Sequence, residues 1–391
     1  DVATHKVRYR PGAGPDVLRE IATDEQYDEI RTALGEGPVV AIVGRTGIGE
    51  DPRLAEAVAA FARELPGGKI MPLARRANVI GALDMGLAPT LLPGRVSESS
   101  AHQEIEAAWG PLPEGLGRNA TSILEGLSDG ELRALVLVGV DPIRDHSEPK
   151  LAADGIAAAE FVVAFDHFLN DSVSMADVVL PVEGFAEVEG TVTNIEGRVQ
   201  KVNRLIPGPG QTRATWSVLD DLARRMGGDL GATSAAAIAK EIATVAPAYR
   251  GVSWDALDWG DGREGLLLPL DEGDQPLEYI PVDGKLAAVQ ARFGLHLGRV
   301  LYDDGVKARM SPSLAALAPD AAVYLNAAEV SALGVEPGAP VIVEGDAGSA
   351  ELPIAIDNSL GNGAVYVPAN LAATKALGGS VAVALEPGGD T

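Results

Sequence analysis

The chain has 391 residues, 46% of them hydrophobic and 4% aromatic, so it can bury a core of two or three domains built mainly from aliphatic side chains. Lys and Arg number 31 against 56 Asp and Glu, and the net charge of −25 opposes binding to phosphate backbones, which argues against a nucleic-acid partner. The sequence contains no cysteine, which excludes disulfides, iron–sulfur ligation and thiolate zinc sites from this chain.

The histidines and the apolar runs predict neither a metal site nor a membrane span. The five histidines form no i, i+4 pair and no HExxH motif, so we expect no metal site. The longest apolar runs, such as residues 134–140, are far shorter than the roughly 20 residues that cross a bilayer, so no membrane insertion is expected. Because the chain begins with Asp1 and no leader pattern follows, we expect a piece of a longer polypeptide.

The first predicted strand and helix follow a polar, acidic lead of about 35 residues. Residues 38–44 form a continuous apolar run that is typical of a buried parallel strand, and residues 51–65 predict a helix with Asp51 as its N-cap. The turn at residues 44–49 has the spacing G-x-x-G-x-G, which matches neither a dinucleotide fingerprint nor a P-loop. A structural turn is therefore favoured over a nucleotide site.

The same alternation of strand and helix continues through the middle of the chain. Strands are predicted at residues 134–140, 161–165 and 177–181, with a helix at 150–159 between the first two. Strands this apolar predict a parallel sheet that helices cover on both faces. A further amphipathic helix is predicted at residues 215–226, with Leu222 and Met226 on its buried side.

The last part of the chain predicts a small β-barrel after an irregular stretch. Residues 251–319 contain clusters of Gly, Asp and Pro and resist assignment. Short strands are then predicted at residues 323–325, 341–343, 351–356 and 365–367. No hydrolase motif G-x-S-x-G occurs, and Glu183, Glu187 and Glu189 favour a solvated or structural role, so no catalytic residue is assigned.

Several motifs, in order along the chain, resemble those of molybdopterin oxidoreductases. Residues 71–94 are similar to the family segment "PL…NxxGAxDMG…LPG", with Asn78, Gly81 and Asp84 in the matching places. Residues 176–200 are similar to "ADVVLP…ExxGTxxNxExRxQ". The resemblance implies an α/β fold with Rossmann-type parallel-sheet domains followed by a small double-psi β-barrel. The implied divisions are a lead at 1–35, α/β domains at 36–230, a helical and irregular linking segment at 231–317 and the barrel at 318–391.

Within that family, residues 298–305 and 311–318 resemble a segment of the large iron–sulfur subunit of bacterial NADH-quinone oxidoreductase, respiratory complex I. In that subunit the amino-terminal half bears [2Fe-2S] and [4Fe-4S] clusters, while the other half keeps the fold without a cofactor. The resemblance implies a structural portion of the peripheral arm that has no cofactor, metal or catalytic residue of its own. Its partners would be the cluster-bearing half and the other subunits, at the cytoplasmic face of the bacterial plasma membrane.

The alternative is the carboxyl-terminal half of a formate-dehydrogenase-like molybdenum or tungsten enzyme that binds a molybdopterin guanine dinucleotide. Five polar residues match positions near the family pocket, namely Asp141, Asp166, Asn194, Arg198 and Asn370. Cofactor-binding members have Gln-Asp and a following Thr-Glu where this chain has Phe165-Asp166 and Asn170-Asp171. A bound pterin nucleotide would lose hydrogen-bond partners there, at about 1–3 kcal/mol for each buried group left unpaired.

A third alternative, a stand-alone nucleotide-binding module, rests only on the turn at residues 44–49. The resemblance also implies that the sheet domain containing residues 190–226 is completed by chain from the amino-terminal half. We therefore expect this piece to expose an apolar seam.

Overall fold

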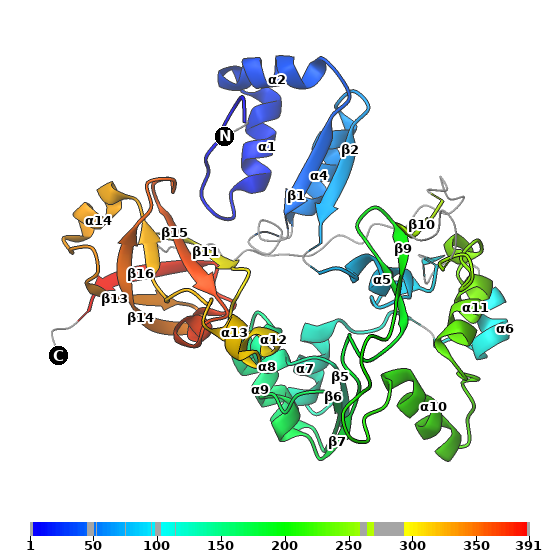
Figure 1. Ribbon diagram of the computed structural model, residues 1–391. Helices are drawn as coiled ribbons and strands as arrows, with labels where there is room; N and C mark the ends of the chain where they lie inside the picture. The colour runs from blue at the N-terminus through cyan, green and yellow to red at the C-terminus, as the bar shows by residue number, and fades with distance from the viewer. Residues whose placement is uncertain are drawn as a thin grey trace. The chain divides into compact units, whose positions relative to one another are not determined.

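The computed structural model describes residues 3–44, 51, 53–74, 76–94, 96–97, 103–113, 115–258, 264–269 and 293–388. Contacts divide the chain into two compact units, which are described separately; the elements are labelled in Figure 1. The first unit comprises Asp1–Leu73, Pro142–Lys150 and Pro281–Thr391, and the second comprises Ala74–Asp141 and Leu151–Ile280. The boundaries at residues 35, 230 and 317 stay predictions, although helices form within the predicted lead.

The amino-terminal part of the first unit is a two-stranded parallel sheet packed against helices. Strand β1 (Val40–Gly44) pairs with β2 (Lys69–Leu73), and α4 (Arg53–Arg63) connects them. Two helices and a 3-10 turn precede the sheet: α1 (Gly14–Thr23), η1 (Glu25–Tyr27) and α2 (Asp28–Gly35). Gly14 lets α1 approach α4, because a Cβ atom at residue 14 would lie 2.9 Å from Leu54 Cδ1. The predicted turn at residues 44–49 falls mostly outside the described residues.

The second unit contains the three-stranded parallel sheet expected from the sequence. Its order is β5 (Ala134–Val138), β6 (Phe161–Asp166) and β7 (Val178–Pro181). The chain passes from β5 to β6 through α9 (Pro149–Ala158), and α7 (Ala120–Ser128) precedes β5. Buried side chains of these helices and of the sheet share one layer: Leu124, Leu127, Leu137, Ala152, Ile156 and Val162.

The opposite face of this sheet corrects the prediction that both faces are covered. Val136 is 59% exposed, Val138 44% and Phe161 47%, although all three are large apolar residues on strands of the sheet. A parallel sheet normally has both faces buried. These exposed residues form an apolar seam on β5 and β6. The seam expected in the domain that contains residues 190–226 stays a prediction.

An antiparallel sheet with its own core forms the rest of the second unit. Its order is β10 (Leu266–Leu267), β9 (Arg198–Val202) and β8 (Gly190–Thr193). The other elements of this unit are α5 (Val79–Asp84), β3 (Leu91–Leu92), β4 (Val96–Ser97), α6 (Gln103–Trp109), η2 (Val173–Met175), α10 (Thr215–Arg225), α11 (Ala235–Val245) and η3 (Pro247–Tyr249). Leu222 and Met226, predicted to be buried on the helix at α10, are exposed. The α10 residue that is buried is Asp220, which pairs with Arg224.

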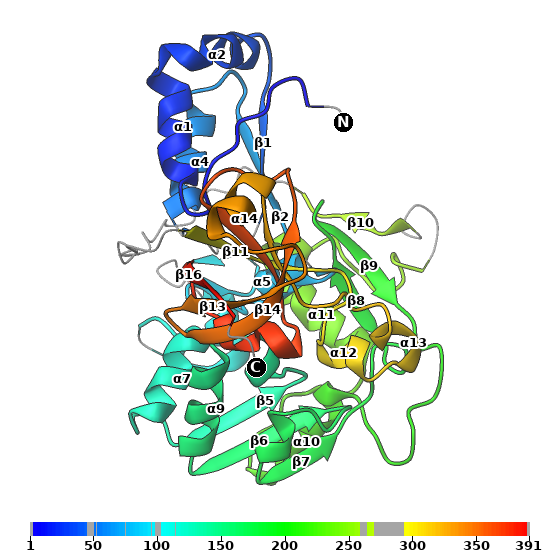
Figure 2. The same ribbon diagram turned by 90° about the vertical axis from the view of Figure 1, so that its left-hand side faces the viewer.

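The barrel in the first unit is closed and has six strands. Its strands are coloured yellow to red in Figures 1 and 2. Its strand order is β11 (Phe293–Arg299), β15 (Ala364–Ala369), β12 (Val323–Leu325), β14 (Gly348–Ile356), β13 (Pro340–Gly345) and β16 (Ala382–Pro387). Helical segments accompany it: α8 (Pro142–Asp145), α12 (Val306–Arg309), α13 (Pro312–Ala315), α14 (Ala327–Leu333) and η5 (Ala372–Leu377). Strand β11 begins within the range predicted as a linking segment. No helix of the described residues combines the length and apolar character needed to cross a membrane.

Alternating aliphatic side chains fill the barrel. Its fully buried members include Leu295, Leu325, Leu352, Ile354, Val365 and Val367. Asn326 caps α14 by accepting a hydrogen bond from the Glu329 amide, and Gly334 ends that helix with a φ of 70°. Both residues follow the sequence rules for helix ends, although no helix was predicted between residues 325 and 341.

Candidate functional site

Two of the predicted cofactor residues lie at the carboxyl edge of the parallel sheet in the second unit. Asp166 is the last residue of β6, and Asp141 follows the end of β5. Asp141 is 1% exposed and Asp166 is 6% exposed. This edge is where open α/β sheets generally bind ligands.

The Asp166 carboxylate accepts hydrogen bonds from the loop that follows it. The amides of His167 and Phe168 donate to its Oδ1 at 2.7 and 3.0 Å, and Asn170 Nδ2 donates to Oδ2 at 3.0 Å. Asn170 Oδ1 in turn accepts a hydrogen bond from the Val173 amide at 2.9 Å. Asn170, which stands at the first position of the family's Thr-Glu pair, therefore folds the loop onto Asp166.

Asp141 is bound on one oxygen only. Ser172 donates its hydroxyl to Asp141 Oδ1 at 2.6 Å and its amide at 3.2 Å. Asp141 Oδ2 is buried and has no hydrogen-bond partner among the described residues. Leaving such an atom unpaired costs about 1–3 kcal/mol, so this oxygen is available to a ligand that brings a donor.

Asn194 and Arg198 belong to the turn of the β8–β9 hairpin. Asn194 Oδ1 accepts hydrogen bonds from the amides of Glu196 at 2.9 Å and Arg198 at 3.0 Å. The Arg198 guanidinium donates to Glu196 at 3.3 Å and to the Gly265 carbonyl at 3.2 Å. Both predicted cofactor residues thus hold the hairpin and its neighbour β10 together.

Asn370 stands in the first unit, directly after β15. With a φ of 58°, it is the one residue other than glycine among those described that has a positive φ. Its Nδ2 atom is buried and has no hydrogen-bond partner within the described chain. An uncommon backbone conformation combined with an unpaired donor is typical of a functional position.

A charged cluster near Asn370 was missed by the sequence reasoning. Arg299 donates to Asp303 Oδ2 at 2.8 Å, and both Nη atoms reach Asp145 Oδ1 at 3.2 Å. Burial lowers the pKa of Arg299, but the Asp303 hydrogen bond and the charges of Asp303 and Asp145 outweigh it and raise the pKa above its ordinary value. Arg299 ends strand β11 and Asp303 lies in the turn that follows, so their spacing carried no signal in the sequence, and Asp145 lies 154 residues away.

Asp304 connects this cluster to the segment after β15. The Asp304 amide donates to the Asn370 carbonyl at 2.9 Å, and Asp304 Oδ2 accepts a hydrogen bond from the Ala372 amide at 2.6 Å. The carboxylates of Asp145 and Asp303 therefore bind the Arg299 guanidinium, and Asp304 beside them binds the segment after β15. The described residues contain no group of His, Cys, Asp and Glu arranged to hold a metal ion.

A buried network joins two of the family-like motifs in the second unit. Tyr249 donates its hydroxyl proton to Asp84 Oδ2 at 2.8 Å, and Thr193 Oγ1 lies 2.7 Å from the same hydroxyl. The Thr193 amide donates to Asn78 Oδ1 at 2.9 Å. A Cβ atom at Gly81 would lie 2.2 Å from Asn78 Oδ1, so any other residue there would displace the Asn78 side chain. These motif residues form a packing unit.

Two family descriptions match most of the chain. "Molybdopterin oxidoreductase" matches residues 53–225, and "Molydopterin dinucleotide binding domain" matches residues 296–388. The second match covers almost the whole six-stranded barrel together with Asn370 and Arg299.

Several curated proteins are similar to the chain. The NADPH-Fe(3+) oxidoreductase subunit alpha of Geobacter sulfurreducens is 30% identical over 70% of this chain and 31% of its own length. The F420-dependent formate dehydrogenase 2 subunit alpha of Methanococcus maripaludis is 28% identical over 77% of this chain and 48% of its own. A subunit of the NADH-quinone oxidoreductase of Rhizobium meliloti is 28% identical over 77% of this chain and 35% of its own. The chain spans less than half the length of each of these relatives.

Among solved structures, acetylene hydratase from Pelobacter acetylenicus matches 68% of this chain and 42% of its own, with a TM-score of 0.49 and 16% sequence identity.

Proposed function

Because this chain belongs to the molybdopterin oxidoreductase family, we propose that it is a structural portion of the peripheral-arm subunit of an NADH-quinone oxidoreductase. In this role it carries no redox centre. It supports electron transfer from NADH to quinone by holding the cluster-bearing part of the subunit and the neighbouring subunits in place. This assigns the assembled protein to the cytoplasmic face of a bacterial plasma membrane.

One observation carries this proposal: the side chains that match the family pocket are bonded mainly to the chain itself. Asp166 is occupied by the loop that follows it, and Asn194 and Arg198 close their own hairpin. Side chains engaged in this way stabilise local structure and need no cofactor as a partner.

The charges near Asn370 fit poorly with a pterin guanine dinucleotide. That cofactor carries phosphate groups, which are recognised by unpaired guanidinium groups and N–H donors. Arg299 is already held between Asp145 and Asp303, and Asp304 adds a further carboxylate. At Arg299, an incoming phosphate would have to displace a carboxylate.

The exposed faces of the parallel strands support a scaffolding role. In addition to the seam on β5 and β6, the β1–β2 pair exposes Val40, Ile42 and Ile70. Apolar sheet faces of this kind bury themselves against other protein.

The proposal is tested on the intact polypeptide that contains this chain, isolated with its partner subunits. We expect iron but no stoichiometric molybdenum or tungsten by elemental analysis, and no fluorescent pterin after acid oxidation. Stoichiometric molybdenum or tungsten together with released pterin would contradict the proposal.

A formate-dehydrogenase-like enzyme is the second candidate, and two unpaired buried atoms favour it. Asp141 Oδ2 could accept a hydrogen bond and Asn370 Nδ2 could donate one to a bound pterin nucleotide. If the intact protein does release pterin, Asn370→Ala should lower the pterin content, whereas Asn358→Ala, which removes an amide side chain elsewhere on the barrel, should not. The two proposals are thus separated by the same pterin measurement.

A further inference from the structure

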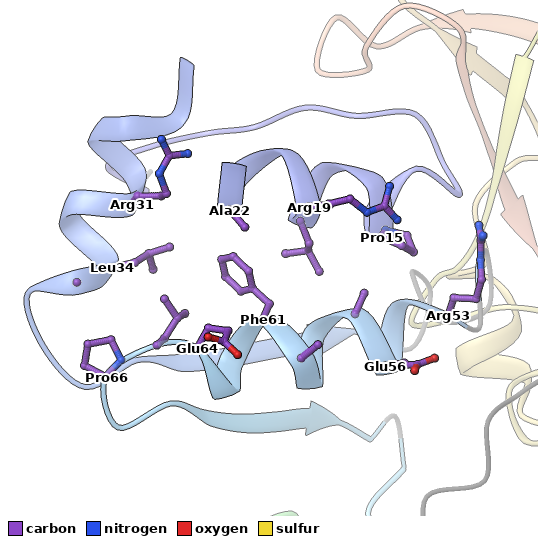
Figure 3. A pocket seen from close by; sticks show the side chains of 15 residues that line it. Pro15, Arg19, Ala22, Arg31, Leu34, Arg53, Glu56, Phe61, Glu64 and Pro66 are labelled. Atoms are coloured by element: carbon purple, nitrogen blue, oxygen red, sulfur yellow. The ribbon is translucent and has the colours of Figure 1, made fainter. Parts of the chain in front are cut away.

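The amino-terminal helices of the first unit enclose an apolar groove that none of the family-like motifs occupies. Helices α1, α2 and α4 form its walls (Figure 3). Its volume is ≈ 840 Å³. The apolar floor of the groove consists of partly buried side chains, namely Leu18, Leu34, Ala57, Phe61 and Leu65. The groove is large enough to receive several side chains at once.

Small residues stand where large ones would shield this floor. Ala22 on α1 and Ala60 on α4 line the groove and are exposed. Figure 3 shows Ala22 and Phe61 facing each other across the space between the two helices. Another backbone can therefore approach the floor closely.

The rim of the groove carries more unpaired negative charges than unpaired positive charges. Arg19 pairs with Asp16 at 3.0 Å, Arg53 with Asp51 at 2.7 Å, and Arg31 with Asp28. Glu56 on α4 and Glu64 directly after it also line the groove, and neither has an ion-pair partner within the described part of the chain. The three arginines are thus neutralised locally, and the rim is left with two unbalanced carboxylates.

The two carboxylates have a helical spacing. They are eight residues apart along α4 and the residue that follows it, which corresponds to about two turns and roughly 12 Å along the helix axis. A helix lying along α4 presents side chains seven or eight residues apart at the same interval.

We propose that this groove binds an amphipathic α-helix of a partner protein, with apolar residues on the floor and basic residues two turns apart beside Glu56 and Glu64. A second copy of the chain fits poorly, because two concave grooves leave a void and the net charge of −25 opposes self-association. A partner helix with lysine or arginine on one flank supplies both the shape and the opposite charge. This proposal is independent of the function proposed above.

The test uses the 391-residue chain and two synthetic peptides of about 15 residues, built from Leu, Ala and Lys to form one apolar face. In the first peptide two lysines stand seven residues apart on one flank, and in the second glutamates replace them. We expect the lysine peptide to bind and the glutamate peptide to bind at least about tenfold more weakly.

Paired variants of the chain locate the binding. Ala60→Trp fills the groove and should weaken the lysine peptide at least about tenfold, whereas Ala55→Trp, on the same helix but outside the groove, should not. The double variant Glu56→Gln/Glu64→Gln should weaken it by about threefold to tenfold and reduce its salt dependence, whereas Glu29→Gln should have no effect.

Equal binding of both peptides, or unchanged binding by Ala60→Trp, would overturn the proposal. So would sedimentation showing that the chain alone dimerises and that Ala60→Trp makes it monomeric, because the occupant would then be a second copy. If Ala60→Trp fails to fold, as judged by circular dichroism, Ala22→Leu on the opposite wall provides the same test.

Discussion

The barrel and the parallel sheet of the second unit are built from equally apolar strands but differ in what those strands bury. The barrel closes on itself, so its strands have no free edge and their inner side chains are covered by one another. Helices α7 and α9 pack on one face of the strands β5, β6 and β7, while the other face buries Phe165 but exposes Val136, Val138 and Phe161. The barrel therefore buries its core within the described chain, whereas the sheet leaves part of its second face exposed.

The largest expected difference between the two regions is in their response to core truncation. Leu325→Ala removes a fully buried side chain from the barrel and should lower its free energy of unfolding by about 2–5 kcal/mol. Val136→Ala on the exposed sheet face should cost less than about 0.5 kcal/mol. Urea denaturation followed by hydrogen exchange of each segment distinguishes the two units. Similar losses at both positions would show that the sheet face is covered in solution.

A smaller loss of stability is expected at Gly81 in the second unit, where a helix and a hairpin pack closely. Gly81→Ala forces a Cβ atom against Asn78 Oδ1 and should disturb the hydrogen bond from the Thr193 amide, costing about 1–3 kcal/mol. Gly190→Ala in the same unit has open space around the new Cβ atom and serves as the matched control. Thermal unfolding of both variants measures the difference, and an unperturbed Gly81→Ala would mean that Asn78 takes another position.

The polar loop after β6 should contribute a similar or slightly smaller free energy to the stability of the second unit. Asp166→Ala leaves the donors of His167, Phe168 and Asn170 without their acceptor, so we expect a loss of about 1–3 kcal/mol. Glu189→Ala, at an exposed position, should change stability little. Faster hydrogen exchange confined to residues 166–175 would support the effect, whereas unchanged exchange there would contradict the role given to Asp166.

The smallest expected effect is a pH dependence at the amino ends of β5 and β6. Arg133 donates to both oxygens of Glu160 at 2.8 and 2.6 Å, and this hydrogen bonding lowers the pKa of Glu160 below its ordinary value. The pKa of Glu160 is lower in the folded state than in the unfolded state. The Arg133–Glu160 pair therefore contributes to stability above the ordinary pKa of Glu160, and this contribution is lost as the pH falls through the lowered pKa.

Arg133→Gln tests this pH dependence. An NMR titration should show the pKa of Glu160 rising toward its ordinary value in the variant. The same change at Arg118, which pairs with Glu131, provides a control that leaves Glu160 unaffected. A Glu160 pKa that does not move would mean that the pair is absent in solution.

Elements of the fold could be predicted where the local sequence pattern matches the burial that the element has in the structure. The apolar runs gave β1, β5, β6 and β7 because parallel strands are continuous in apolar residues. Strands β8 and β9 were missed because their apolar residues alternate with Thr, Lys and Gln over only four or five positions. The apolar runs could not predict which face of the sheet is exposed. A run of apolar residues looks the same in the sequence whether the face is buried within this chain or left exposed.

The candidate site was predictable only in part, for a similar reason. Asp141 and Asp166 could be placed at a sheet edge because each follows a predicted strand. The hydrogen bonds that occupy Asp166 come from an irregular loop, and the carboxylate of Asp145 reaches Arg299 across a long stretch of chain. Such contacts depend on tertiary structure, which no local pattern encodes.

The network of Asn78, Gly81 and Thr193 has a consequence for how proteins of this fold are classified. These residues lie in the segments by which the chain resembles the molybdopterin enzymes, yet here they fasten a helix to a hairpin. Packing needs these residues whether or not a prosthetic group is bound. The motif therefore indicates the fold, and catalytic capacity has to be judged from other positions, such as Asp141, Arg299 and Asn370.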